Sequence, residues 1–419
     1  MRARGQPRGR SRWRASVRPD IMAVMKKAPL LILFITVFLD LLGFGIVLPL
    51  LPYYAVDFGA DAFAVGGLLA IYSLAQLIFS PLWGRLSDRV GRRPVILLSL
   101  VGSSIGLTVF GLANTLWLLF ASRLFSGITA ATISVAQAYI ADSTTAENRA
   151  KGMGIIGAAF GLGFVFGPAI GGLLAQFGHG VPAFAAAGLA LANAVFAYFK
   201  LPESLPPEQR GQVVPRGFSL KRLAAGMAIP NMAPLMVLYF FTIFAFATME
   251  ATFPLLTQDR LGFTEVENGY VFAYIGVLIV ILQGGLVGRL AKRFGERSLI
   301  VAGALCLAVS LALLPFAPTV GMLLLVLVPL AVGNGLTNPS LTSLISQTAE
   351  SSAQGETLGL AQSLAALGRV LGPLWGGFAY AYMGQELSYV IAGVIMLAMF
   401  GLAFTIRQPA KAEPGGAAP

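Results

Sequence analysis

Residues 84–94 read GRLSDRVGRRP, and residues 288–298, which begin 204 positions later, read GRLAKRFGERS. Two further pairs of stretches recur at an offset of 205: residues 163–172 (GFVFGPAIGG) with 368–377 (GRVLGPLWGG), and residues 49–51 with 254–256, both PLL. Three matches at essentially one offset indicate an internal repeat. The sequence therefore predicts two copies of one structural unit.

The chain is rich in apolar residues and poor in charge. Of its 419 residues, 57% are hydrophobic and 11% are charged, and the mean hydropathy is +0.79, far from the balance of a soluble domain. A membrane-spanning helix needs about 20 mostly apolar residues. Twelve runs meet this requirement, at residues 30–53, 63–86, 94–114, 116–141, 152–176, 182–200, 234–257, 268–290, 298–316, 320–346, 357–382 and 387–406.

Six runs fall in each copy of the repeat, and an even number of crossings returns the chain to its starting side. Both copies therefore enter the membrane from the same side, as parallel repeats related by an axis along the membrane normal. The predicted fold class is an all-α polytopic membrane protein, with twelve transmembrane helices in two parallel-repeat six-helix bundles. Such bundles suggest alternating access by rocking about a site at the midplane.

The segments outside the bundles are polar. We expect a disordered basic arm at residues 1–29, bundles at 30–201 and 234–407, a linker at 202–233 that is too rich in Pro, Gly and charge to build a core, and a disordered tail at 408–419. The first twenty residues carry seven Arg and no apolar stretch, unlike a secretory signal. A transit peptide is an alternative, and we favour a disordered arm or a start at Met22 or Met25.

The net charge of +11 follows the predicted topology. Of the 29 Lys and Arg, 26 fall on the side that an even topology assigns to both termini, Arg123 and Arg369 lie within runs, and Arg260 alone is on the other side. The positive-inside rule places the basic side in the cytoplasm of a plasma (inner) membrane. The basic charge thus predicts no nucleic-acid partner.

Aromatic residues stand at the ends of several runs. Tyr53, Tyr54 and Trp117 occupy ends away from the basic loops, and Tyr and Trp are enriched at membrane interfaces. We expect these three to act as interfacial anchors.

The chain has one cysteine, Cys306, and one histidine, His179. A single cysteine allows no intramolecular disulfide, and no metal-ligand cluster is indicated. Chemistry that depends on His or Cys, such as acyl transfer or zinc proteolysis, is therefore not favoured. We expect a protein that is not an enzyme and uses no cofactor or metal.

The loop at 84–94 places an acid at a fixed point among arginines and glycines, which an ordinary basic loop does not explain. Its pattern, G-x-L-x-D-R-x-G-R-R, resembles the signature loop of the major facilitator superfamily. In that family the loop is a cytoplasmic latch between the halves. The resemblance implies gating roles for Gly84, Asp88, Arg89, Gly91, Arg92 and Arg93, with Asp142 as a charge partner. Lys292 replaces Asp88 in the second copy.

Three more patterns resemble twelve-span drug and proton antiporters, the tetracycline efflux pumps in particular. They are Asp40, Gly43, Gly45, Pro49 and Pro52 in the first run, Arg123 and Gly127 in the fourth, and the antiporter motif Gly163, Gly167, Pro168, Gly171 and Gly172 in the fifth. The likeness covers residues 30–407. Glycines four apart also let helices approach closely, and Pro168 removes a backbone hydrogen bond, so packing alone explains the last motif equally well.

Asp40, Arg123 and Glu250 place charge inside apolar runs, where charge usually marks a pathway or a partner. A guanidinium keeps its proton and needs a partner, for which Asp40 is a candidate. An acid that faces each side of the membrane in turn can take up a proton outside and release it inside. We predict that Asp40 is the principal proton carrier, that Arg123 tunes it, and that Glu250 binds cationic substrate or shares the coupling.

The predicted substrate-binding residues are polar or aromatic side chains within the runs. Glu250 shares one helical face with Phe246 and Tyr239, and three i, i+4 pairs lie on other runs: Tyr72 with Gln76, Tyr270 with Tyr274, and Asn334 with Asn338. Each pair fits a cavity lining, and each fits hydrogen bonding between helices.

The predicted function is proton-coupled export of lipophilic, often cationic drugs by a monomer whose partners are the lipid bilayer, protons and a small-molecule substrate. Tetracycline pumps carry acids in the third and ninth spans, whereas the runs 94–114 and 298–316 contain none, so the resemblance favours a broader drug range. Two alternatives stay open: a proton-linked transporter of a metabolite such as a sugar, and a membrane receptor or scaffold that does not transport.

Overall fold

The structure is a computed structural model that describes residues 19–144, 146–211, 227, 229–349 and 354–408, with no strand among them. The first half contains α1 (Pro19–Val47), α2 (Leu51–Asp57), α3 (Ala62–Val90), α4 (Arg92–Gly111), α5 (Leu116–Thr129), α6 (Thr132–Ser143), α7 (Ala146–Ala175), α8 (Val181–Lys200) and the 3-10 turn η1 (Pro207–Gln209). The second half contains α10 (Met232–Leu261), α11 (Glu265–Ile281), the π-helical turn η2 (Leu282–Leu286), α12 (Val287–Phe294), α13 (Glu296–Leu313), the 3-10 turn η3 (Leu314–Phe316), α14 (Val320–Thr348), α15 (Gln354–Met383) and α16 (Gln385–Ala403). Residues 1–18 of the expected arm, 212–226 and 228 of the linker, and 409–419 of the tail lie outside the described residues.

Eleven helical segments of the described chain are long and apolar enough to cross a membrane, and each coincides with one predicted run. The remaining run corresponds to α15, which has 30 residues but is diluted by Gln362, Ser363, Arg369 and several glycines. Since α15 packs between α10 and α3 of the opposite half, its polar side chains have protein neighbours. The predicted membrane-spanning helical fold is confirmed.

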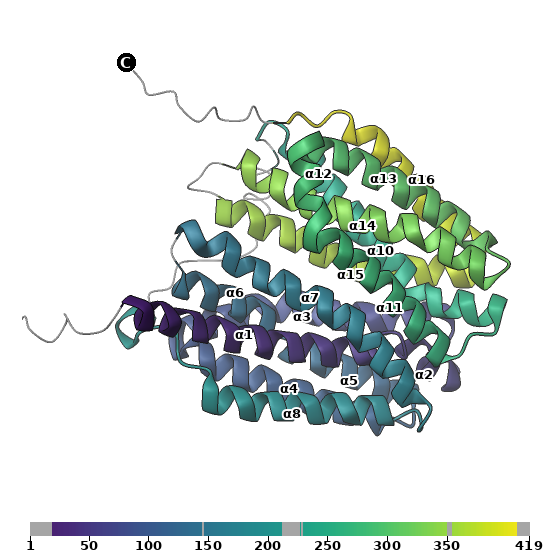
Figure 1. Cartoon of the computed structure of the whole chain (residues 1–419). Helices are drawn as coiled ribbons and strands as arrows, with labels where there is room; N and C mark the ends of the chain where they lie inside the picture. The colour runs from purple at the N-terminus through teal and green to yellow at the C-terminus, as the bar shows by residue number, and fades with distance from the viewer. Residues whose placement is uncertain (1–18, 145, 212–226, 228, 350–353, 409–419) are drawn as a thin grey trace, which may run out of the picture.

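The two halves lie against each other along their length, with the second half (green to yellow) above the first (purple to teal) in Figure 1. Across the boundary, α3 packs against α15 and α7 against α11. These are the second and fifth spans of each half, so the contact between the halves repeats the symmetry that the sequence predicts.

The repeated glycine motif packs in the same way in both halves. On α7 three glycines, Gly163, Gly167 and Gly171, lie against α1, and on α15 Gly368, Gly372 and Gly376 lie against α10. Their neighbours around each helix face the other half: the Pro168 carbonyl and Gly172 lie against Gly269 of α11, and Pro373 and Gly377 lie against α3. Each motif therefore lies against a helix of its own half on one side and against a helix of the other half on the other side.

Three predicted spans are interrupted in the structure. The first ends as α1 at Val47 and resumes as α2 at Leu51, the fourth breaks between Thr129 and Thr132, and the eighth contains the π-helical turn η2. By contrast, α7 continues as a helix through Pro168. Periodicity predicts the runs but not these breaks. The break between Thr129 and Thr132 is bonded to the side chain of Ser99 on α4, which periodicity within the run does not show.

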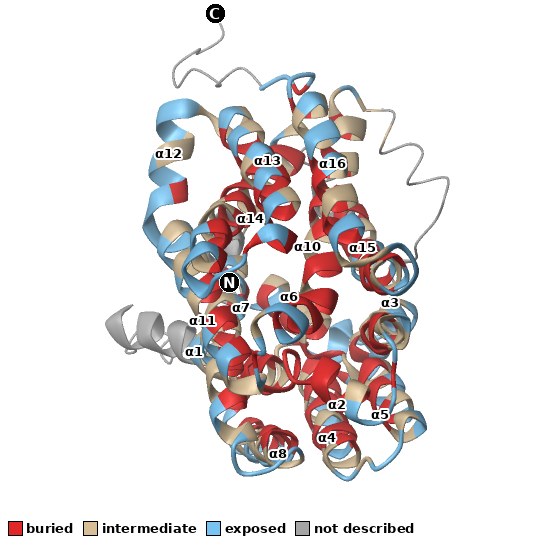
Figure 2. Ribbon diagram, turned by 90° about the vertical axis from the view of Figure 1, so that its right-hand side faces the viewer, coloured by how far each residue is buried: buried red, intermediate tan, exposed pale blue. Residues whose placement is uncertain are grey.

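Buried residues gather inside each half (Figure 2). The apolar clusters of the first half are built around Leu50 and Tyr139, and those of the second around Phe253 and Leu341. The start of the expected linker differs from the prediction, because Leu201 and Leu205 are buried and residues 202–211 pack on the first half. Tyr53 and Tyr54 are also buried, so they are not interfacial anchors, whereas Trp117 is 84% exposed.

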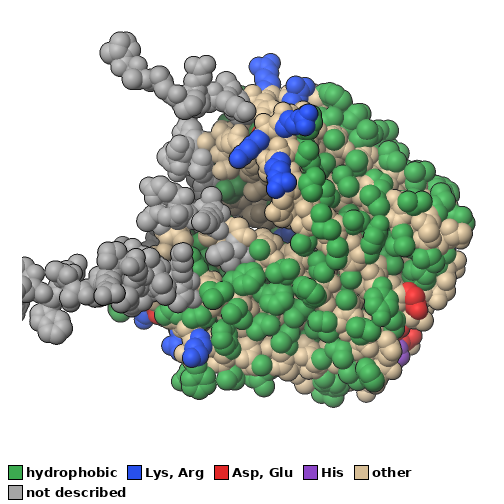
Figure 3. All heavy atoms as spheres, viewed as in Figure 1, with side chains coloured by type: hydrophobic (Ala, Val, Ile, Leu, Met, Phe, Trp, Pro, Cys, Tyr) green, Lys and Arg blue, Asp and Glu red, His purple; other side chains and the backbone are tan. Residues whose placement is uncertain are grey.

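The two ends of the bundle differ in charge. We call the end with residues 84–94 and 288–298 the basic end, and the end with Asp57, Glu265 and Glu386 the acidic end. In Figure 3 Lys and Arg gather at the left, Asp, Glu and His at the right, and hydrophobic side chains cover the surface between them. This apolar belt fits a membrane, with the two ends in water.

Candidate functional site

Asp40 lies in the middle of α1 and is partly buried inside the first half. The hydroxyl of Thr132, the first residue of α6, is close enough to its carboxyl group to act on it. The phenol of Tyr72, on α3, lies within electrostatic range of Asp40. The break in the fourth span thus brings a hydroxyl to the acid of the first.

Arg123, on α5, does not pair with Asp40 as predicted. Its guanidinium carbon lies 4.5 Å from the centroid of the Tyr72 ring, and no ion pair joins Arg123 to an acid among the described residues. The side chain is only 4% exposed, so the aromatic face covers the cation. Spacing along the sequence shows that both charges are buried, but not that an aromatic ring lies against one of them.

Glu250, on α10, lies within electrostatic range of Arg369 on α15. Within the described chain its buried Oε1 has no hydrogen-bond partner. Tyr239 also lies near Arg369, and its hydroxyl accepts a 3.2 Å hydrogen bond from Gln362. The acid of the second half is therefore accompanied by a cation to which the sequence analysis assigned no role.

Several other predicted lining residues take part in packing or hydrogen bonds between or along helices. Tyr274 donates to the carbonyl of Leu324 at 3.4 Å and packs on the second-half core, as does Phe246. Asn338 donates to the side chain of Asn334 at 2.5 Å. These contacts are hydrogen bonds and packing between or along helices; Tyr270 is 53% exposed and Gln76 is partly buried.

The halves are in close contact toward the acidic end. A Cβ added to Gly269 would lie 2.6 Å from the Pro168 carbonyl oxygen, and one on Gly172 would lie 3.0 Å from the Glu265 carbonyl oxygen. The Tyr53 hydroxyl lies 3.2 Å from the carbonyl oxygen of Phe263. Backbone approach this close leaves no room for a path between the helices.

Toward the basic end the same helices separate. Gly161 of α7 still meets Val280, where an added Cβ would lie 3.1 Å away. Closer to the basic end, an added Cβ on Gly154 or Gly157, or on Gly285 beyond α11, would meet nothing within 4 Å. The surface is hollowed between the halves at this end (Figure 3). The space that contains the central charges therefore opens toward the basic end.

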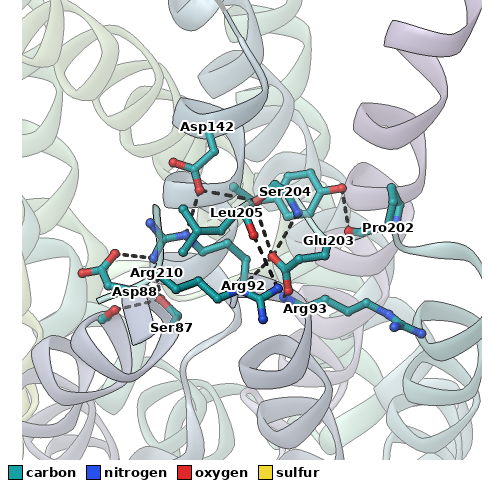
Figure 4. A network of polar contacts seen from close by, with 12 residues as sticks. Ser87, Asp88, Arg92, Arg93, Asp142, Pro202, Glu203, Ser204, Leu205 and Arg210 are labelled. Carbon is teal, nitrogen blue, oxygen red and sulfur yellow. Dashed lines mark hydrogen bonds and ion pairs between the residues drawn. The ribbon is translucent and has the colours of Figure 1, made fainter. Parts of the chain in front are cut away.

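The loop at 84–94 is held by a polar network (Figure 4). Arg92 is 5% exposed and forms ion pairs of 2.6 Å with Asp88 and 2.8 Å with Asp142, and it donates to Ser87 at 2.7 Å. The predicted contact with Asp142 is confirmed, while the gating role stays a prediction. Arg89 is exposed, and Gly84 has open space around it.

Glu203, just after α8, completes this network. Its carboxylate accepts backbone hydrogen bonds from Arg92 at 2.9 Å and Arg93 at 3.2 Å, at the start of α4. An acid there satisfies free amide groups and complements the helix dipole. Gly91, at φ +109°, lies against the same carboxylate, so a side chain at this position would be strained and would displace Glu203. All these partners belong to the first half and the start of the linker.

Three residues of these polar clusters were not among the predicted site residues: Arg369, Thr132 and Glu203. Arg369 could have been identified in the same way as Arg123, because both are arginines inside an apolar run. Nothing in the sequence distinguishes Thr132 or Glu203 from other polar residues at span breaks and ends.

Comparison with known proteins agrees with this architecture. Residues 33–350 and 284–419 match the Major Facilitator Superfamily, and the chain belongs to this family of membrane transporters. It is 34% identical over 397 residues to the class D tetracycline resistance protein of Salmonella ordonez, covering 92% of this chain and 98% of that protein. It is 32% identical over 391 residues to multidrug resistance protein 2 of Bacillus subtilis, covering 91% and 96%.

Solved structures show the same fold. The human organic anion transporter MFSD10 (TETRAN) aligns with a TM-score of 0.71 and 28% identity, over 90% of this chain and 99% of that one. A bacterial homologue of the lysosomal transporter Spinster, inward-facing and occupied, aligns with a TM-score of 0.72 and 16% identity, over 93% and 97%. The chain is thus a multi-pass membrane transporter and not an enzyme, which leaves the receptor or scaffold alternative without support.

Proposed function

We propose that this transporter exports lipophilic small molecules in exchange for protons, by alternating access. One observation carries the proposal: Asp40 lies in a polar cluster of the first half, and the two halves are in close contact at the acidic end and separate at the basic end. An acid in this position can be reached from one side only, and rocking of the halves would transfer its access to the other. The tetracycline and multidrug resistance relatives support export of drugs.

We assign the basic end, with both termini, to the cytoplasm, since Lys and Arg concentrate there. The described conformation is then open inward and ready to receive substrate. One charge that moves inward through 100 mV provides about 2.3 kcal/mol, before any pH gradient contributes. The monomer contains both halves of the site, so one chain suffices for the exchange.

The loop at 84–94 would act on the equilibrium between conformations. Its described side-chain contacts join Asp88, Arg92 and Asp142 within the first half, so in the inward-open state the latch is not engaged with the second half. Closing the basic end would bring the loop toward α15, whose Gly359 is unobstructed here.

Everted membrane vesicles energised with a pH gradient test the proposal. Asp40→Asn should insert normally and abolish gradient-driven transport of tetracycline or a lipophilic dye. Asp57→Asn, which changes an exposed acid at the acidic end of the same predicted span, should transport normally. Full activity of the Asp40 variant would reject the proposal, and proton release from purified protein with sugars but not dyes would favour the metabolite alternative.

A further inference from the structure

Two arginines lie between the halves, and they differ in accessibility. The guanidinium of Arg123 is covered by Tyr72 and the side chain is 4% exposed. Arg369 is exposed, although it lies in the middle of a membrane-spanning bundle. A guanidinium exposed at this depth must face the space between the halves rather than lipid, because lipid offers a cation no partner.

The packing of α15 confirms the direction in which Arg369 points. Residues 369, 373 and 377 follow at i, i+4 and i+8, so they share one helical face. Pro373 and Gly377 on that face lie against Gly66 and Ala62 of α3. Arg369 is one turn nearer the basic end, and its side chain is exposed there. It therefore faces the opening, within range of Tyr72 in one half and Tyr239 and Glu250 in the other.

No partner fixes this guanidinium. Among the described residues, Arg369 forms neither a hydrogen bond nor an ion pair within 4.0 Å. Glu250 attracts it from a greater distance, with Oε1 buried and without a hydrogen-bond partner. A planar group with five donors thus stands open beside two phenol rings, and carboxylates are the groups that its fork matches.

We propose that Arg369 anchors a negatively charged group of the substrate, so that the preferred substrates are lipophilic molecules with a carboxylate or a similar anion, including zwitterions. The assignment rests on the proposed transport function and specifies its substrate class. Tyr72 and Tyr239 supply aromatic surface for the apolar body. Glu250 is placed to receive a cationic group of a zwitterion, and its attraction for simple cations is offset by Arg369.

Tetramethylrhodamine and its methyl ester provide a matched test, since they differ by one esterified carboxylate. Fluorescence polarisation with purified protein in detergent reports binding without a proton gradient. The unchanged protein should bind the free acid more tightly than the ester. Arg369→Gln should weaken binding of the acid about tenfold or more, as expected for loss of a charge-assisted pair, and leave the ester unchanged or tighter.

Two controls keep the result interpretable. Arg260→Gln removes an arginine at the acidic end, paired with Glu386 outside the cavity, and should keep the preference for the acid. Arg369→Lys keeps the charge without the planar fork and should retain part of the preference for the acid. This variant also tests the inference if the Gln variant fails to fold.

The inference is overturned if the unchanged protein prefers the ester, or if Arg369→Gln keeps the preference for the acid. An Arg369-dependent preference in a protein that transports neither dye would leave this inference standing and reject the proposed function instead.

Discussion

The side-chain amide of Asn268, in the second half, donates a hydrogen bond to the hydroxyl of Tyr53 in the first half. The same amide donates to Thr257 at 2.8 Å, and the Tyr53 hydroxyl reaches the carbonyl oxygens of Phe263 and Thr264 at 3.2 Å each. Tyr53 is 4% exposed and Asn268 is completely buried. Because this network is sealed from water, it is well placed to hold the acidic end closed.

Removing the Tyr53 hydroxyl should therefore favour opening of the acidic end. Tyr53→Phe leaves the Asn268 amide short of an acceptor, which costs about 1–3 kcal/mol and shifts the equilibrium roughly 5- to 150-fold. Spin labels at Phe58 and Leu387, in a Cys306→Ser background, report the separation of the two halves at this end. We expect a larger population of long distances in the variant.

Tyr54 offers a matched control next in the chain. It is 5% exposed, and in the described chain its hydroxyl makes no hydrogen bond. Tyr54→Phe should leave the distance distribution as it was. Equal shifts in the two variants would show that ring packing, not the hydrogen bond, keeps the end closed.

His179 also bridges the halves, but at the surface. Its imidazole nitrogens lie 3.6 Å from Asp57 in the first half and 3.6 Å from Glu265 in the second, with a His179 side-chain exposure of 65%. Exposed ion pairs contribute about 0–1 kcal/mol. His179→Gln should thus shift the spin-label distances less than Tyr53→Phe does. A shift as large as that of Tyr53→Phe would contradict this account.

Arg89, at the end of α3, and Arg92, at the start of α4, are close in sequence, and the structure predicts opposite sensitivities. Arg92→Ala leaves Asp88 and Asp142 facing each other without their shared cation, which should destabilise the first half by about 3 kcal/mol. Arg89 is exposed, so Arg89→Ala should stay within about 0.5 kcal/mol. Unfolding in a denaturing detergent series measures both. Similar losses for the two variants would show that the loop needs its total charge and not the buried ion pairs.

Much of the architecture could be predicted from the sequence, because the apolar runs and their repeat reflect the bilayer that surrounds the whole chain. A run of about 20 apolar residues has few alternatives to a membrane helix. The prediction was least secure for α15, whose glycines pack against helices on both sides rather than against lipid.

The site was less predictable, because it depends on which helix faces which. Asp40 and Glu250 stand out as acids within apolar runs of the sequence, and the structure places both partly buried. The partner of Arg123 could not be read from spacing, since Tyr72 lies on another helix. Tyr53 was assigned to the membrane interface for the same reason, while its partner Asn268 lies 215 residues away.

Ser99 of α4 holds the break between α5 and α6 that presents Thr132 to Asp40. Its hydroxyl donates to the Thr129 carbonyl at 2.7 Å and accepts from the backbone amides of Ala131 and Thr132 at 2.9 and 3.1 Å. Ser99→Ala removes the side-chain acceptor of two buried amides, of which that of Ala131 keeps a bond to the Thr129 carbonyl. We therefore expect a loss of stability of about 2 kcal/mol and weaker substrate-induced proton release. Ser103→Ala, one turn along α4, removes a hydroxyl that makes no hydrogen bond in the described chain. This variant should have the stability and the substrate-induced proton release of the unchanged protein. If the two variants behaved alike, the break would be held by packing of Gly102 against Thr129 rather than by the serine.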